Sequence, residues 1–161
     1  MANSDFISSA KNKILSDLQN DELFLQVLGV NEEEIEEGLV YKRLFPFYYI
    51  YDGTQNVVKT YICVEVDIKS VSRNGMYVHP TIIFTIISHQ DDVRLNMAGV
   101  SKTRPDYLAE IIDEKYNGAA GFGYGRLLLI SNVAGSIDTT YRYRQLVFRG
   151  VDMNDSLCGG E

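Results

Sequence analysis

The order of regular segments between residues 60 and 149 most constrains how this chain can fold. Apolar runs of strand length cover residues 60–69, 81–88, 126–131 and 141–149. Between the two pairs of runs, residues 104–117 combine a helix cap, an apolar stripe of helical period and a closing Asn-Gly. With an amphipathic helix expected near the N-terminus, this order predicts an α+β fold. Its mainly antiparallel sheet has a strand–strand–helix–strand–strand core and packs with an N-terminal helix and one central helix.

The predicted helices have recognisable starts and ends. Ser4 is the expected N-cap of a helix to about residue 19, whose apolar stripe consists of Phe6, Ala10, Ile14 and Leu18. A short helix over residues 21–28 is predicted to end at Gly29. In the central helix Thr103 is the expected N-cap, and Asp106 is expected to complete a capping box.

Length and composition fit a soluble protein. The 161 residues predict one domain over residues 1–152 and a short C-terminal tail over residues 153–161. No apolar run approaches the roughly 20 residues of a membrane-spanning helix, and the N-terminus does not resemble a secretory signal, so we expect no membrane contact. The net charge of −7 argues against general affinity for nucleic acid, which requires Lys and Arg to neutralise phosphates.

Residue types suited to catalysis or metal binding are sparse. His79 and His89 lie near opposite ends of one predicted strand, roughly 30 Å apart if it is extended, so they cannot share a metal site within a single subunit. Cys63 and Cys158 are interpreted as two free thiols, although a disulfide between them is an alternative. The glycine-rich residues 118–125 follow a helix and precede a strand, the reverse of a phosphate-binding loop, and are interpreted as a connector. We therefore expect no enzyme activity and no cofactor.

One alternative from a different functional class remains open. Asp67 and Lys69 match the acidic-x-Lys element of metal-dependent nucleases, and Asp52 offers a second carboxylate. Two carboxylates can hold Mg²⁺ while a lysine on the same strand face orients water. A solvent-facing strand with alternating charges gives the same three-residue pattern without catalysis, which is the simpler interpretation.

The predicted strands differ in how their faces are covered. In residues 60–69 one face is apolar, and the other, expected to face water or a wet cavity, is formed by Tyr61, Cys63, Glu65, Asp67 and Lys69. Residues 81–87 are continuously apolar, which predicts a strand inside the sheet with both faces covered. In residues 141–149 both faces are mixed, which predicts a strand whose neighbours come partly from another subunit.

Two segments that precede these strands have unusual compositions. Residues 31–37 hold five glutamates and are interpreted as a solvated helical turn, with a docking site for a basic partner as the alternative. Residues 44–51 hold five aromatic residues, for which a core layer is favoured over an interface anchor. Pro46 restricts this segment to the edge of a sheet or a bulge.

The loop over residues 70–80 is long for a hairpin, so we expect the hairpin to extend past the sheet as an arm. Asn74 and Gly75 favour a tight reversal, and Arg73, Met76 and Tyr77 are residue types enriched at interfaces. Two interpretations stay open: an interface formed by Arg73, Asn74, Met76 and Tyr77, or an ordinary mobile hairpin tip.

The element order resembles that of the tail-terminator proteins, also called tail-completion or neck proteins, of long-tailed bacteriophages. The resemblance is carried by the strands at residues 60–69 and 81–90, by residues 104–113 of the central helix and by the closing strand at residues 141–152. It is architectural, covers residues 5–152 as a pattern, and includes no short signature motif. The stretch over residues 31–51 departs from the smallest members of that family.

The resemblance implies a virion protein, assembled in the host cytoplasm, that forms a hexameric ring. Such a ring caps the tail tube, ends tail polymerisation and joins the tail to the head-closure ring, so the implied partners are further copies of the chain, the tail tube protein and the head-closure protein. DNA would pass without specific contacts, and we expect Glu65 and Asp67 to face this channel, where negative charge lets DNA slide. Arg73, Asn74, Met76 and Tyr77 are then expected to contact a subunit or the tail tube. Another connector ring protein, such as a head-closure or adaptor protein, is the alternative.

Overall fold

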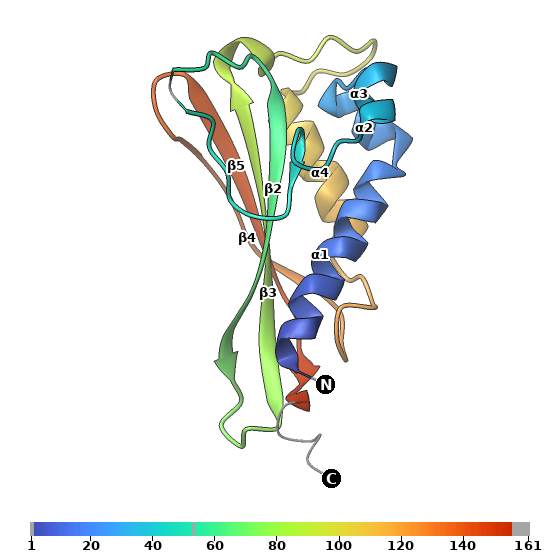
Figure 1. The fold of residues 1–161 in the computed structure, drawn as a ribbon, viewed down its shortest axis with the longest axis vertical. Coiled ribbons are helices and arrows are strands. Elements are labelled where there is room, and N and C mark those ends of the chain that lie inside the picture. Colours follow the sequence, from blue (N-terminus) through green and yellow to red (C-terminus); the bar gives the residue numbers. More distant parts are fainter. Residues whose placement is uncertain (1, 53, 156–161) are drawn as a thin grey trace.

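A sheet with helices on one face is the framework of the computed structural model, which describes residues 2–52 and 54–155 (Figure 1). In these residues the sheet has the strand order β1-β2-β3-β5-β4, and β6 pairs with β3. The strands are β1 (Leu44–Phe45), β2 (Thr60–Val71), β3 (Tyr77–His89), β4 (Leu128–Ser136), β5 (Tyr141–Arg149) and β6 (Asp152–Met153). The helices are α1 (Asn3–Gln19), α2 (Glu22–Leu28), α3 (Glu32–Glu37) and α4 (Arg104–Tyr116), with a 3-10 turn, η1 (Gln90–Asp92), after β3. Among the strands of the described residues, β1 and β2 are the one parallel pair, so the predicted α+β class with a mainly antiparallel sheet is confirmed.

The central position of β3 agrees with its continuous apolar sequence. β2 pairs along one side of β3 and β5 along the other. Ile82 and Phe84 are fully buried toward the helices, and Ile87 is buried on the opposite face. The prediction of an interior strand is therefore confirmed, although Ile83 is only half-buried.

The neighbours of β5 differ from the prediction. β5 lies between β3 and β4, so both of its neighbours belong to its own chain, and the expectation of a neighbour from another subunit is wrong. Its mixed pattern has a local cause, because Arg144 forms an ion pair with Asp106 of α4 at 2.7 Å. β4 is the strand at the edge of the sheet, and it runs to Ser136, five residues beyond the predicted end. The glycine-rich residues 118–125 connect α4 to β4, as predicted.

The helix termini follow most, but not all, of the predicted caps. α1 begins after Ala2, whose backbone N–H donates to Asp5, so Ser4 is not the N-cap. Asp21 caps α2 by accepting from the Phe24 N–H, and Gly29 ends it in a left-handed conformation (φ +77°). Thr103 caps α4 as predicted, but the Asp106 carboxylate contacts Arg144 instead of completing the expected capping box.

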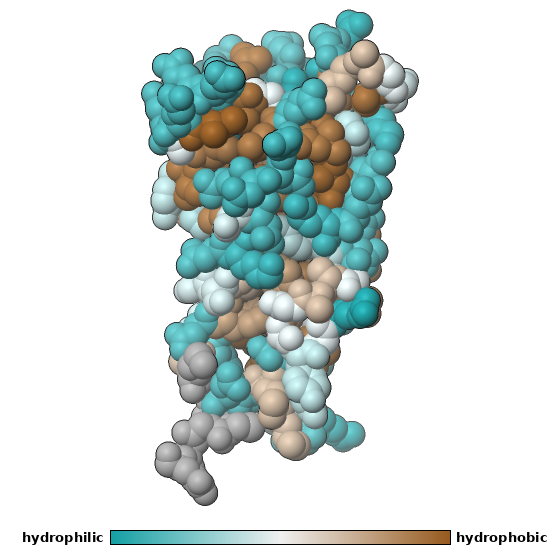
Figure 2. Space-filling model, turned by 90° about the vertical axis from the view of Figure 1, so that its right-hand side faces the viewer, coloured by the Kyte–Doolittle hydropathy of each residue, from teal (hydrophilic) through white to brown (hydrophobic). Residues whose placement is uncertain are grey.

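The main core lies between the helices and the sheet. It includes Ile14, Leu18, Phe24, Leu108 and Ile112 from the helices and Ile62, Val64, Phe84, Leu146 and Phe148 from the strands. Figure 2 shows the helical side, where apolar side chains gather near the end of the molecule that holds α2 and α3. Partly buried residues of α2 and of the segment before α4, among them Leu25, Leu95 and Met97, pack on the core and remain partly open to solvent.

A second, aromatic cluster covers the upper part of the opposite sheet face, which we call the outer face. Residues 45–51, named here the strap, pack on β2. Within the strap the Phe45 and Tyr49 rings stack 4.5 Å apart, and the Tyr51 ring meets Tyr61 of β2 edge to face at 5.0 Å. Core packing of this segment is thus confirmed for these three strap residues. The strap also buries Tyr61 and Cys63, so the prediction that they face water is wrong.

A buried arginine, which the sequence did not indicate, connects α2, α3 and β2. Arg43 is 2% exposed; its Nε donates to the Thr60 carbonyl at 2.8 Å and its Nη2 to the Leu28 carbonyl at 2.6 Å. Its Nη1 donates to Glu34 Oε1 at 2.8 Å, and Lys59 contacts the same carboxylate oxygen at 3.1 Å. α3 buries none of its side chains, which confirms a solvated turn; Glu34 links it to Arg43 and Lys59, and Glu37 forms an exposed ion pair with Lys42.

Candidate assembly surfaces

The strap leaves part of the outer face open, namely the part toward the arm, beyond Glu65 of β2. Side chains of β2, β3, β5 and β4 form cross-strand rows there, because paired residues of neighbouring strands project to the same side. Two of these rows are Glu65–Ile83–Val147–Ser131 and Asp67–Thr81–Arg149–Leu128. The face therefore has carboxylates at its β2 side, apolar residues at its centre and an arginine beside β4.

Glu65 and Asp67 share the outer face, as their alternating pattern predicts, but their surroundings differ. Glu65 holds the strap: its Oε1 accepts from the Tyr48 N–H at 3.2 Å and its Oε2 forms an ion pair with Lys11 of α1 at 3.1 Å. Asp67 lies 3.6 Å from Lys69 in an exposed ion pair, and its side chain is 43% exposed. Asp67 is thus the more open of the two carboxylates, while Glu65 also has a structural task.

The hairpin of β2 and β3 extends beyond the other long strands as an arm, defined here as residues 68–80 (Figure 1). The ladder continues as far as the Val71–Val78 pair, and only residues 72–76 form the turn. In the turn the Gly75 N–H donates to the Ser72 carbonyl at 2.8 Å, and Asn74 Oδ1 accepts from the Met76 N–H at 3.1 Å. Gly75 has a φ of +75°, which explains why glycine suits this position. The predicted arm and its tight reversal are confirmed.

The arm tip is anchored and also exposes the predicted contact residues. Asn154, after β6, donates through Nδ2 to the Gly75 carbonyl at 2.8 Å and accepts from Asn3 of α1 at 2.8 Å. Residues 153 and 154, expected to begin a tail, thus belong to the fold. The exposed residues of the arm tip are Val71, Arg73, Asn74, Met76 and Tyr77, and Met153 beside them is also exposed. The turn has a hydrogen-bonded structure and presents an apolar, singly charged surface.

β4 forms a second candidate contact surface. None of its nine residues is charged, and Leu128, Ile130 and Val133 are exposed. Within the described parts of the chain, no strand pairs with its outer side. An uncharged edge with exposed apolar side chains is a template for pairing with another strand.

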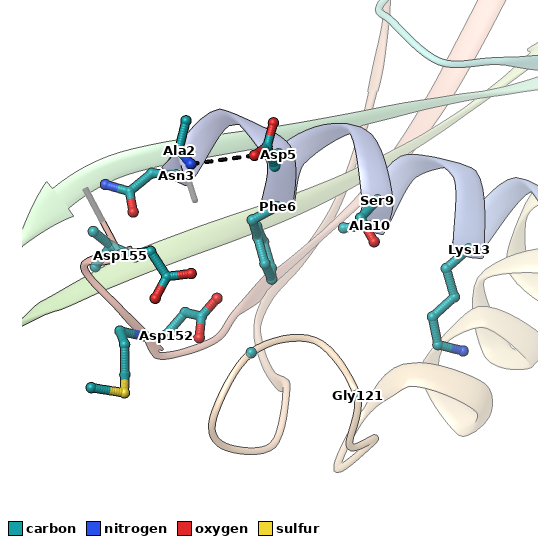
Figure 3. Close-up of a pocket in the computed structure, with 13 residues that line it drawn as sticks. Ala2, Asn3, Asp5, Phe6, Ser9, Ala10, Lys13, Gly121, Asp152 and Asp155 are labelled. Carbon is teal, nitrogen blue, oxygen red and sulfur yellow. Dashed lines mark hydrogen bonds between the residues drawn. The ribbon is translucent and has the colours of Figure 1, made fainter. Parts of the chain in front are cut away.

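A pocket of about 260 Å³ lies between the start of α1, the arm and the glycine-rich connector (Figure 3). Figure 3 shows Phe6 projecting from α1 toward the loop that carries Gly121, with Asp152 and Asp155 nearby. Asp5, at the α1 end of the pocket, accepts from the Ala2 N–H at 3.2 Å. The pocket thus combines an apolar wall with carboxylates that also serve local structure.

Of the residues of the nuclease alternative, the structure brings Asp67 and Lys69 together but leaves Asp52 elsewhere. Asp52 accepts from the Thr54 N–H at 3.2 Å in the loop after the strap, next to Tyr51, whose ring packs on Tyr61. Tyr61 precedes Asp67 by six residues on β2, a separation of about 20 Å along an extended strand. In the part of the chain that the structure describes, no three His, Cys, Asp or Glu residues are grouped to hold a metal ion.

The imidazoles and thiols occupy separate environments. His79 lies in the arm, whereas His89 is buried at the other end of β3 and hydrogen-bonds Asn56 Oδ1 at 2.8 Å. Cys63 is buried under the strap and accepts from the Tyr49 N–H at 3.3 Å, and burial raises the pKa of its thiol to about 11. Cys158 lies outside the described residues.

Comparisons with known proteins place this fold in a family. A model of the YomW family, a phage-type family related to Bacillus phage SPbeta, matches residues 11–149, which include most of α1 and the strands β1 to β5. Comparison with curated proteins gave no match, and comparison with solved structures gave none. No helix in the described ranges is both long and apolar enough to cross a membrane. The match covers most of the chain, and the protein therefore belongs to the YomW family.

Proposed function

We propose that this protein is a structural component of the phage neck. In this proposal, copies form a ring that caps the tail tube, ends tail polymerisation and joins the tail to the head-closure ring. The protein acts through assembly and is not an enzyme. It is made in the host cytoplasm and becomes part of the virion.

The proposal is supported by two observations taken together: the chain belongs to a phage-type family, and its fold exposes surfaces suited to contacts between proteins. One end of the sheet projects an anchored arm, and one edge is the uncharged strand β4. Arm residues Arg73, Asn74, Met76 and Tyr77 are exposed, as a contact with a neighbouring subunit or the tail tube requires.

The outer face of the sheet is the proposed wall of the DNA channel. Asp67 is its open carboxylate, and the net charge of −7 favours DNA passage without tight binding. Arg149 shares the row of Asp67, so the proposed wall carries both signs of charge rather than a purely acidic surface.

Electron microscopy of lysates from phage lacking this protein tests the proposal. A terminator predicts overlong tails without heads, because nothing stops tail growth or completes the joint. Tails of normal length beside filled, unattached heads would instead assign the protein to head closure or to an adaptor. Normal infectious particles would refute a role in the neck.

A further inference from the structure

The sheet has two lateral edges with backbone groups free to pair: β4 at one end of the strand order, and part of β2 at the other. β4 has no partner on its outer side in the described residues. On the opposite side, β1 pairs only with Ile62 and Cys63 of β2, and the strap contacts β2 as far as Glu65. In the described residues no strand pairs with the free edge of β2 at residues 67–71, because β3 lies along its other edge; a bulge between Ile68 and Ser70 divides this segment.

The strand directions allow these two edges to meet in consecutive copies of the chain. Each neighbouring pair along β2, β3, β5 and β4 is antiparallel, so β4 runs opposite to β2. A second copy in the same orientation, placed beside β4, presents its β2 in the antiparallel direction. The alternation of the sheet then continues from one copy into the next without inverting the molecule.

The composition of β4 favours this use of its edge. Proteins normally protect a long edge strand with charges, Pro or a covering element. β4 has neither a charged residue nor Pro, and after its bulge between Leu129 and Ser131 it pairs regularly with β5 through Ser136. A six-residue regular segment with an exposed Val133 is thus available to a partner strand.

The charges beside the two edges favour contact between unlike edges. β5, immediately behind β4, carries Arg142, Arg144 and Arg149 and no acidic residue, and of these three Arg144 forms an ion pair with Asp106. Beside the β2 edge, Glu65 pairs with Lys11 and Asp67 with Lys69, so that edge is close to neutral. Pairing two β4 edges would bring the arginines of both copies together, whereas pairing β4 with the β2 edge of the next copy avoids this repulsion.

We propose that copies of this chain associate head to tail, with the edge of β4 pairing antiparallel to residues 67–71 of β2 in the next copy. β1 and the strap occupy β2 at residues 62–65, so β4 of a neighbouring copy must pair further along, at residues 67–71. Neighbouring copies are therefore offset along the strand direction, an offset that tilted strands accommodate in closed barrels. Head-to-tail contacts of this kind produce a ring when the rotation closes. The inference rests on the proposed ring function for its closure and specifies the contact that would form it.

Cross-linking between two proteins that each carry one introduced cysteine tests this contact. One protein carries Ser70→Cys and the other Ser131→Cys, both with Cys158→Ser; positions 70 and 131 project to the same, outer face of the sheet. Cys63 is buried and serves as an internal control for the fold. A short thiol-reactive cross-linker is applied to the mixed purified proteins and to particles assembled from both. We expect links between positions 70 and 131 in the mixture, and none when either protein is present alone.

Each alternative result has a separate meaning. Links between two copies of position 131 would replace the proposal with a two-fold β4 contact. Rings visible by electron microscopy without links between positions 70 and 131 would overturn this contact and leave the ring function standing. Monomers alone, both in solution and in particles, would overturn both.

A matched pair of lysine substitutions provides an independent measurement. Val133→Lys places a charge on the β4 edge, and Val58→Lys places one after the strap at nearly equal exposure, 48% and 46% in the native protein. We expect Val133→Lys to weaken self-association about tenfold or more in sedimentation or light-scattering titrations. Val58→Lys should associate normally, and both should keep the native melting temperature within a few degrees. Equal association of the two variants would overturn the role of β4.

Discussion

Replacing the buried arginine Arg43 by alanine tests how the helices are attached to the sheet. Arg43→Ala removes three hydrogen bonds and leaves the carbonyls of Leu28 and Thr60 without their donor. Breaking a buried, hydrogen-bonded charge pair costs about 3–5 kcal/mol. Lys59 still contacts Glu34, so the remaining carboxylate keeps one cation, and we expect the lower end, about 3 kcal/mol.

The loss should be measured by urea denaturation and by calorimetry. For a protein of this length, about 3 kcal/mol lowers the melting temperature by roughly 6–12 °C. Lys42→Ala is the matched control, because its ion pair with Glu37 is exposed, and such pairs contribute at most about 1 kcal/mol. If Arg43→Ala and Lys42→Ala lost the same small amount of stability, Arg43 would not be the link between α2, α3 and β2 that its contacts indicate.

Three further predictions concern pH, the arm and the proposed channel. Burial alone would raise the pKa of Glu34, but hydrogen bonds from Arg43 and Lys59 outweigh burial and lower that pKa. The stabilisation that ionised Glu34 contributes is therefore full above about pH 4.5 and is lost as pH falls further. In urea titrations, Glu34→Gln should lose less unfolding free energy than the native protein between neutral and acidic pH. Shortening residues 72–77 to a two-residue turn removes the Gly75 carbonyl that accepts from Asn154 and the Tyr77 partner of β6, so it should lower the melting temperature by a few degrees without unfolding the protein. It should also abolish ring formation or tail attachment in electron micrographs, and normal particles would show that the tip makes no required contact. Asp67→Lys should fold normally and slow DNA passage in an ejection assay, because the lysine adds a contact to DNA phosphates. The double variant with Glu65→Lys should also be less stable, because Glu65 holds the strap. Ejection of DNA at the native rate from Asp67→Lys particles would show that Asp67 does not face the channel.

Local sequence signals accounted for much of the fold. The boundaries of β5 agreed with its alternating pattern, and Thr103 and Gly29 marked real helix ends, because caps and period depend on neighbouring residues. The second half of β4 was missed, since residues 132–136 are small or polar and adopt a strand only through pairing with β5. The pairing of β4 with β5 depends on residues far apart in the sequence. It also overturned the expectation that residues 141–149 have a neighbour from another subunit.

The candidate surfaces were predictable only in part. Alternation placed Glu65 and Asp67 on one face, and the turn signal located the arm. The partners that distinguish the two carboxylates were not predictable: Lys11 is 54 residues from Glu65 in the sequence. Arg149 joins the same surface through the register of two strand pairings, which no single segment encodes.

The reaction rate of the Cys63 thiol, which lies beneath the strap, can be used to measure how often the strap detaches from the outer face. Burial raises the pKa of Cys63 to about 11, so the thiol is almost wholly protonated at pH 7, and only the thiolate reacts readily with alkylating reagents. The Phe45 and Tyr49 rings of the strap stack beside it, so labelling requires both detachment of the strap and loss of a proton. The alkylation rate of Cys63 in free protein and in assembled particles therefore reports how often this aromatic layer opens. A fall in that rate on assembly would mean that neighbouring subunits hold the layer closed.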